Sequence, residues 1–166
     1  MKKLLLLILL AFFITSCGSS KKTSSTTNST VNNAGKSSNK TVNSVIKYAK
    51  TFEGTRYKFG GTSKTGMDCS GLVYVSYQKE NIAMPRVSRD MAKKGTRISI
   101  AKTTKGDLLF FKTNKNSNTI NHVGLVVENN RGEIFFIHST SSRGVIISSL
   151  KESYWNKAFV EVRRVI

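Results

Sequence analysis

The feature that most constrains this chain is a glycine-rich loop at 60–73 that runs directly into an apolar helix. It reads GGTSKTGMDCSGLV, so Cys69 falls at or near the first turn of that predicted helix. A helix N-terminus has backbone N–H groups without intrahelical partners and carries the positive end of the helix dipole. Both favour an anion and therefore lower the pKa of a cysteine placed there. The position predicts a nucleophilic Cys69; a buried cysteine with a packing role is the alternative.

The residues before position 42 are predicted to lie outside the folded domain. Lys2 and Lys3 precede an apolar run at 4–14, which is typical of a signal peptide and shorter than the roughly 20 residues of a membrane span. The run ends in ITSC and resembles a bacterial lipobox, which implies cleavage before Cys17 and lipidation of its thiol. We therefore expect a signal peptide at 1–16; an ordinary secretory signal is the alternative. Residues 17–41, rich in Ser, Thr, Asn and Lys, are expected to form the lipidated anchor and a flexible tether.

The net charge of the chain is strongly positive, with 27 Lys and Arg against nine Asp and Glu. Nucleic-acid binding is not expected, because no helix-turn-helix spacing, zinc-ligand cluster or aromatic-interleaved basic strand accompanies the charge. The basic residues are spread along the chain, which favours attraction to an anionic polymer or surface. A disulfide framework is not expected from two cysteines placed as differently as Cys17 and Cys69.

The remaining residues, 42–166, are predicted to form one α+β domain in which helices precede an antiparallel sheet. Apolar residues at helical spacing predict a helix at 42–53, and the Cys69 helix is expected to run to about Glu80. A short helix is expected from Pro85 to about Lys93, with Ser88 as its N-cap. Five β-rich runs come after it, and they lie at 108–111, 122–128, 133–138, 145–147 and 159–165.

The domain contains one cysteine and two histidines, and together these supply the parts of a nucleophilic site. A cysteine nucleophile needs a base to accept its proton and a third group to orient that base. His122 and His138 lie on the two arms of a predicted hairpin, and imidazole titrates near neutral pH. The alternative is a zinc site formed by Cys69, His122 and His138, although such sites more often have closely spaced ligand pairs.

A catalytic pair of histidines requires both side chains on one face of the sheet. Placing His122 opposite His138 gives paired residues whose numbers sum to 260, and centres the turn on Asn130. We therefore expect a three-residue loop at 129–131, with Gly132 at positive φ in a bulge. A two-residue turn with a sum of 261 and no bulge would send the histidines to opposite faces.

Six short motifs in this domain resemble, in order and spacing, those of NlpC-type cell-wall peptidases. They are Tyr57-x-x-Gly60-Gly61, Asp68-Cys69-Ser70-Gly71-Leu72-Val73, Pro85-Arg86-x-Ser88, Gly106-Asp107-Leu108, His122-Val123-Gly124 and Ile137-His138-Ser139. The resemblance implies a papain-like α+β fold and hydrolysis of a peptide bond in peptidoglycan stems. The implied bond joins γ-D-glutamate to diaminopimelate, or is the peptide cross-link in some members. Phe59 and Lys105 depart from the family pattern, which often has Trp and Pro there.

The resemblance also implies a role for individual residues. Cys69 attacks, His122 acts as base and then as acid, and His138 orients His122. Tyr57 helps to hold the oxyanion, and Asp68 and Ser70 contact the stem peptide. Arg86 and Ser88 line the pocket.

The resulting expectation is a lipid-anchored endopeptidase of the bacterial cell envelope. Its partners are peptidoglycan stem peptides and, through Cys17, a membrane; we expect a monomer with no metal or other cofactor. The alternatives are an amidase or acyltransferase of the same fold, or a non-catalytic wall-binding module.

Overall fold

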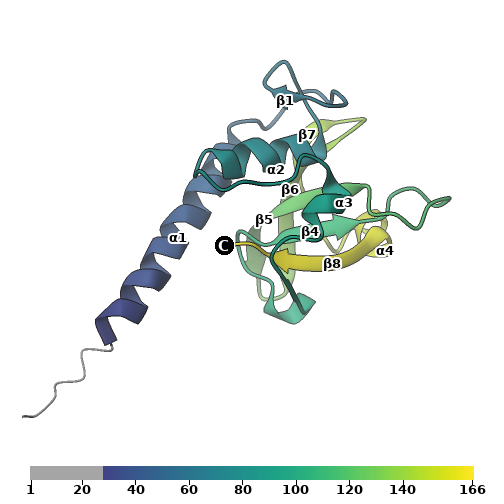
Figure 1. The fold of residues 1–166 in the computed structure, drawn as a ribbon. Helices are drawn as coiled ribbons and strands as arrows, with labels where there is room; N and C mark the ends of the chain where they lie inside the picture. Colours follow the sequence, from purple (N-terminus) through teal and green to yellow (C-terminus); the bar gives the residue numbers. More distant parts are fainter. Residues whose placement is uncertain (1–27) are drawn as a thin grey trace, which may run out of the picture.

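A computed structural model of the chain describes residues 28–166, with side chains from residue 38 onward (Figure 1). The predicted signal peptide at 1–16, the predicted lipid site Cys17 and the start of the predicted tether lie outside the described residues. The helices are α1 (Asn28–Lys50), α2 (Cys69–Gln78), α3 (Ser88–Met91) and α4 (Ser153–Ala158), with a 3-10 helix at Ile100–Lys102. The strands are β1 (Thr62–Ser63), β2 (Gly66–Met67), β3 (Thr96–Ile98), β4 (Leu108–Phe111), β5 (His122–Asn130), β6 (Glu133–Thr140), β7 (Gly144–Ser149) and β8 (Phe159–Arg164).

The main sheet is antiparallel and has the strand order β3-β8-β4-β5-β6-β7, which confirms the predicted α+β class. It has six strands rather than the predicted five. The prediction missed β3, whose three residues pair only with β8, and the small β1–β2 ribbon before α2. These strands have two or three residues each, too few to show a period in the sequence.

Helix α1 begins at Asn28, fourteen residues before the predicted start, so 28–41 is helical rather than an irregular tether. Val45 and Ala49 are fully buried against the domain, which anchors the last turns as predicted. A helix that is already nucleated extends at little cost, because each added residue gains one hydrogen bond. This extension explains a helix through a segment with no apolar stripe. In Figure 1 the first turns of α1 project away from the sheet and from α2.

Both faces of the sheet are buried, and strand β4 shows how. Leu108 and Phe110 belong to the core shared with α1 and α2, whereas Leu109 and Phe111 belong to a second core with Trp155 of α4. Side chains alternate between faces along a strand, so a four-residue apolar run serves both cores.

The predicted helix between Pro85 and Lys93 is present as α3, but its N-cap is Val87; Ser88 is already helical and makes no cap bond.

The β5–β6 hairpin differs from its predicted register, and the difference determines where the histidines lie. Its turn has two residues, Arg131 and Gly132, both at positive φ as a type I′ turn requires. The pair numbers sum to 263 next to this turn, a register that would send the histidines to opposite faces. A β-bulge at Val127 then changes the sum to 262. The predicted sum of 260 and the odd loop are therefore wrong, but the bulge returns both histidines to one face.

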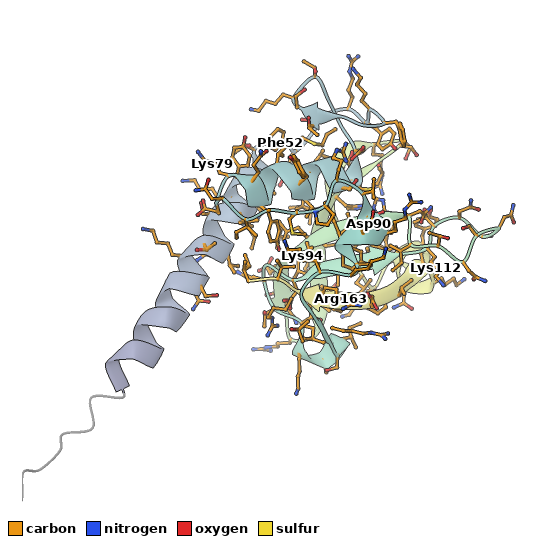
Figure 2. The ribbon with its side chains drawn as sticks, viewed as in Figure 1. Phe52, Lys79, Asp90, Lys94, Lys112 and Arg163 are labelled. Atoms are coloured by element: carbon orange, nitrogen blue, oxygen red, sulfur yellow. The ribbon has the colours of Figure 1, made fainter. Side chains whose placement is uncertain are left out.

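The positive charge is distributed over the surface, as the sequence predicted. Lys79 follows α2, Lys94 follows α3 and Lys112 follows β4, and Figure 2 shows these three well apart. Ion pairs among the described residues join six basic side chains to acidic ones, which leaves most of the basic excess facing solvent.

Candidate active site

Cys69 is the first residue of α2, as predicted. The helix is capped by Asp68, whose carboxylate accepts a 2.6 Å hydrogen bond from the backbone N–H of Gly71. Cys69 is 9 % exposed, and its thiol lies beside the backbone N–H of Val123, the residue after His122. The end of α2 therefore brings the thiol next to the first residues of β5.

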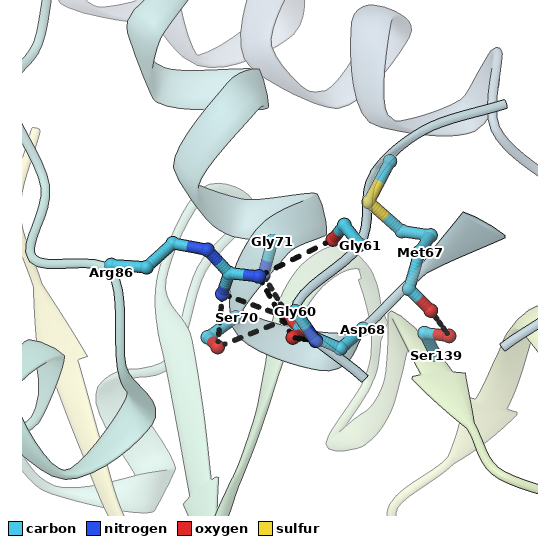
Figure 3. A network of polar contacts seen from close by, with 8 residues as sticks. All are labelled: Gly60, Gly61, Met67, Asp68, Ser70, Gly71, Arg86 and Ser139. Carbon is cyan, nitrogen blue, oxygen red and sulfur yellow. Dashed lines mark hydrogen bonds and ion pairs between the residues drawn. The ribbon is translucent and has the colours of Figure 1, made fainter. Parts of the chain in front are cut away.

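Asp68 also organises the loop in front of the helix (Figure 3). Its carboxylate accepts bonds from the N–H of Gly60 at 2.7 Å, from the Ser70 hydroxyl at 3.2 Å and from both terminal nitrogens of Arg86 at 3.0 and 2.8 Å. With the Gly71 bond this makes five donors, which fills the roughly four lone-pair positions of a carboxylate. These bonds hold the Arg86 guanidinium and the loop that contains Gly60 next to Cys69. Contact of Asp68 and Ser70 with a stem peptide stays a prediction, and it would require displacing one of these bonds.

Two close contacts fix the distance between α2 and its surroundings. A Cβ on Gly71 would lie 2.1 Å from the carbonyl oxygen of Gly61, so only glycine allows the loop to approach the helix. The buried Ser139 hydroxyl donates a 2.8 Å bond to the carbonyl of Met67, two residues before Cys69 (Figure 3). This bond ties the histidine-bearing strand β6 to the segment that leads into Cys69.

His122 and His138 meet as predicted, and their rings are almost completely buried. His122 Nε2 lies 2.9 Å from His138 Nδ1, with His122 8 % and His138 0 % exposed. Because Nε2 is used in this bond, Nδ1 is the only nitrogen of His122 left to accept a thiol proton. That role requires His122 to carry its own proton on Nε2 and to donate it to His138. The pairing is compatible with the tautomer that a base at Nδ1 needs.

Aromatic rings enclose the histidine pair, and no pattern in the sequence had indicated this enclosure. The Trp155 ring stacks on His122 with centroids 5.0 Å apart and planes 22° apart, and it meets His138 edge-on at 4.5 Å. Phe136 packs on His138 at 4.5 Å, and a Cβ on Gly124 would approach its ring to 2.4 Å. Trp155 is the single tryptophan of the chain, and that rarity is the one signal that could have drawn attention to it.

Burial governs the protonation of the site. It raises the pKa of the Cys69 thiol, and the N–H groups of Cys69, Ser70 and Val123 oppose this shift without cancelling it. The expected lowering by the helix N-terminus is therefore present but outweighed, which corrects the sequence-based prediction. Burial also lowers the pKa of His122 to about 4 and lowers that of His138. At neutral pH the resting pair is a thiol and a neutral imidazole.

The remaining predicted residues lie on the loops around Cys69. Tyr57 is half-buried, and burial together with the nearby Cys69 and Asp68 raises the pKa of its hydroxyl, which keeps it a hydrogen-bond donor. Arg86 is held by Asp68, and Ser88 is buried in α3. Within residues 28–166 no group of three or more His, Cys, Asp or Glu side chains is arranged to hold a metal ion. None of the helices described is both long and apolar enough to cross a membrane.

Replacing Trp155 with alanine is expected to expose the histidine pair. Removing a side chain that is 5 % exposed should destabilise the fold by about 3–5 kcal/mol. Loss of the stacked ring should also raise the pKa of His122 from about 4 toward 6.5, because burial is what lowers it. NMR titration of the imidazole measures the shift. Tyr154→Ala, at a 57 % exposed neighbour, is the matched control and should leave the pKa of His122 in place.

The reactivity of Cys69 should follow pH in a way that reports its protonation. In a Cys17→Ala background Cys69 is the only thiol, and its rate of alkylation by iodoacetamide is expected to rise about tenfold per pH unit from pH 6 to 8. The reason is that a raised pKa leaves little thiolate at neutral pH. His122→Ala should keep the same slope. A plateau that begins near pH 5 and disappears in His122→Ala would instead indicate a resting thiolate–imidazolium pair.

Comparison with known proteins identifies the arrangement. The model of the NlpC/P60 family matches residues 54–164. The chain is 39% identical over 117 residues to the probable endopeptidase NlpC of Escherichia coli K12, covering 70% of this chain and 73% of that protein. It is 37% identical over 116 residues to the murein DD-endopeptidase MepS/murein LD-carboxypeptidase of the same organism, covering 69% of this chain and 58% of the relative.

Solved structures agree with the sequence matches. A Staphylococcus aureus Mu50 protein described as similar to a lipoprotein of the NLP/P60 family superposes with a TM-score of 0.66 at 35% identity. The match covers 76% of this chain and 42% of that one, so this chain corresponds to less than half of the solved protein. Sequence motifs, fold and relatives lead to one conclusion: this chain belongs to the NlpC/P60 family.

Proposed function

We propose that this chain is a peptidoglycan hydrolase, and specifically a cysteine endopeptidase that cleaves a peptide bond in the stem peptides. The bond between γ-D-glutamate and diaminopimelate, or the peptide cross-link, is the expected target. The observation that carries the proposal is the buried, hydrogen-bonded His122–His138 pair beside the helix end that holds Cys69. The relatives named as an endopeptidase and as a murein DD-endopeptidase support peptide-bond cleavage in the same polymer.

The first half of the proposed reaction forms an acyl-enzyme. The Cys69 thiol gives its proton to His122 Nδ1, and the sulfur attacks the carbonyl carbon of the scissile bond. The tetrahedral oxyanion accepts hydrogen bonds from the backbone N–H at the start of α2 and from the Tyr57 hydroxyl. His122 then passes its proton to the leaving nitrogen, the C–N bond breaks, and the acyl group remains on Cys69 as a thioester.

The second half regenerates the enzyme. Water gives a proton to His122 while its oxygen attacks the thioester carbonyl, and the sulfur leaves with that proton returned to it. Through both halves the bond to His138 holds the His122 ring in one orientation and stabilises the positive charge that forms on it. Burial, to which the stacked Trp155 contributes, lowers the pKa of His122 and so keeps the base neutral at rest.

Digestion of purified sacculi tests the proposal directly. The products should be muropeptides whose masses show cleavage within the stem, with a new amino terminus on the residue after the scissile bond. Iodoacetamide should stop the reaction and a metal chelator should not. Release of intact stems from the glycan would indicate an amidase, and products that carry a transferred acyl group would indicate an acyltransferase. No product from sacculi or muropeptides would overturn the hydrolase.

The membrane anchor is a separate proposal, supported by the lipobox-like sequence that ends at Cys17. Cys17→Ala is expected to move the protein from the detergent-extracted fraction to the soluble envelope fraction, because acyl chains on that residue would be its attachment. Activity of the domain on sacculi should be unchanged. A Cys17→Ala protein that stays with the membrane would contradict lipidation at this position.

A further inference from the structure

Two adjoining cavities lie along the face of the sheet that α4 covers, and His122 lines one of them. The first, of about 300 Å³, is lined by His122, Trp155 and the β6–β7 turn with Arg143. The second, of about 550 Å³, is lined by Lys112, Lys115 and Lys157. Both cavities share Thr113 and Tyr154 as lining residues, so they lie next to each other. None of the residues predicted to bind substrate lines either cavity.

The lining of these cavities is strongly positive. It contains four basic side chains, Arg143, Lys112, Lys115 and Lys157, against the single carboxylate of Glu152. Glu152 accepts the backbone N–H of Ser149 at 3.0 Å, which is a local turn contact. None of the four basic groups forms an ion pair with any residue of 28–166, whereas six basic groups elsewhere do. Their charge is therefore available to a ligand.

The first cavity lies where the substrate on the leaving side of the scissile bond is expected to pass. His122 must deliver its proton to the leaving nitrogen, so the substrate beyond that nitrogen has to pass His122. His122 lines this cavity, and Arg143 is close enough for its charge to act on His138. A leaving segment that follows this cavity would lie beside Arg143, with its more distant part toward the three lysines.

We propose that these two cavities form an anion-binding subsite for carboxylates on the leaving side of the substrate. Arg143 binds the carboxylate nearest the scissile bond, because a guanidinium fork matches a carboxylate. The lysines near Lys112, which lies at the end of β4 in Figure 2, attract carboxylates further along. This inference rests on the proposed function and adds to it a preference among substrates.

A pair of stem-peptide substrates tests the subsite. The two peptides are identical except that the leaving-side carboxylates are free in one and amidated in the other. The protein should cleave the free form with a kcat/KM about 10-fold higher, mainly through KM, as expected for one charge-assisted contact. Because Arg143, Lys115 and Lys157 are exposed and Lys112 is half-buried, this preference should shrink as sodium chloride rises from about 50 to about 500 mM.

Substitutions of the basic residues show which of them cause the preference for free carboxylates. Arg143→Gln should remove most of it and Lys157→Gln a smaller part, each measured as the ratio of kcat/KM for the free peptide to kcat/KM for the amidated peptide. Lys79→Gln makes the same charge change at the end of α2, away from both cavities, and should keep the full preference. Equal cleavage of both peptides by the unaltered protein, or a preference that survives Arg143→Gln combined with Lys157→Gln, would overturn the subsite and leave the hydrolase intact. Cleavage of neither peptide would overturn both.

Discussion

Replacing Cys69 with alanine should lower kcat/KM for stem-peptide cleavage by at least about 10⁴-fold, and His122→Ala should lower it as far. Each change removes one half of the proton transfer that generates the nucleophile, so neither residue acts without the other. The Cys69→Ala/His122→Ala double variant should consequently be no slower than either single variant. Product release from defined muropeptides, followed by mass, measures all three. Losses that multiply in the double variant would show that the two residues act independently.

The fold of these variants has to be checked separately, because both side chains are buried. Cys69→Ala removes a single sulfur atom and should leave the thermal unfolding midpoint within a few degrees of the unaltered protein. His122→Ala leaves a cavity under Trp155 and is expected to be less stable. An inactive Cys69→Ala protein that is fully folded therefore gives the cleaner result.

His138→Ala should lower kcat by about 10³-fold while changing KM little. The substitution leaves the Nε2–H of His122 without its 2.9 Å acceptor inside a buried site, so the ring loses both its orientation and its tautomer. His138→Gln restores a carbonyl acceptor at similar reach and should recover at least tenfold of the loss. Steady-state kinetics on the same muropeptides provide the measurement.

Rescue by glutamine separates orientation from packing. If His138 only filled space between Phe136 and Trp155, a glutamine of different shape would not restore turnover. Equal activity of His138→Ala and the unaltered protein would remove His138 from the mechanism. In that case the bond to His122 would be structural.

The residues proposed to carry the chemistry could be predicted from their local sequence and from the small number of Cys and His side chains in the domain. The end of a glycine-rich loop places Cys69 on a helix N-terminus whatever the rest of the fold does. The histidines could be paired because one face of a hairpin must hold both. That requirement constrains only whether the register is odd or even, so the sequence predicted the shared face and missed the actual turn at Arg131 and Gly132.

The features that could not be predicted depend on contacts between distant parts of the chain. Trp155 lies on a six-residue helix that the sequence does not distinguish from a loop, and it reaches His122 only because α4 folds over the far side of the sheet. The pKa of Cys69 was misjudged for the same reason. The helix end was visible in the sequence, but the burial that outweighs it arises only once the chain is folded around the thiol.

The bulge at Val127 divides the hairpin into two parts, and only the part next to the histidines has to keep its register. On the histidine side of it, the frame between Leu125 and Ile137 must be kept, because one added or lost residue there inverts the site. On the turn side, a change confined to the exposed residues 130–132 that keeps the frame at Val126 and Phe136 leaves the histidines where they are, whereas Ile134 is buried in the second core and Asn129 donates a 2.7 Å bond to the carbonyl of Thr103. The exposed turn is therefore a place where residues can be inserted, or a label or second protein attached, without moving the histidines.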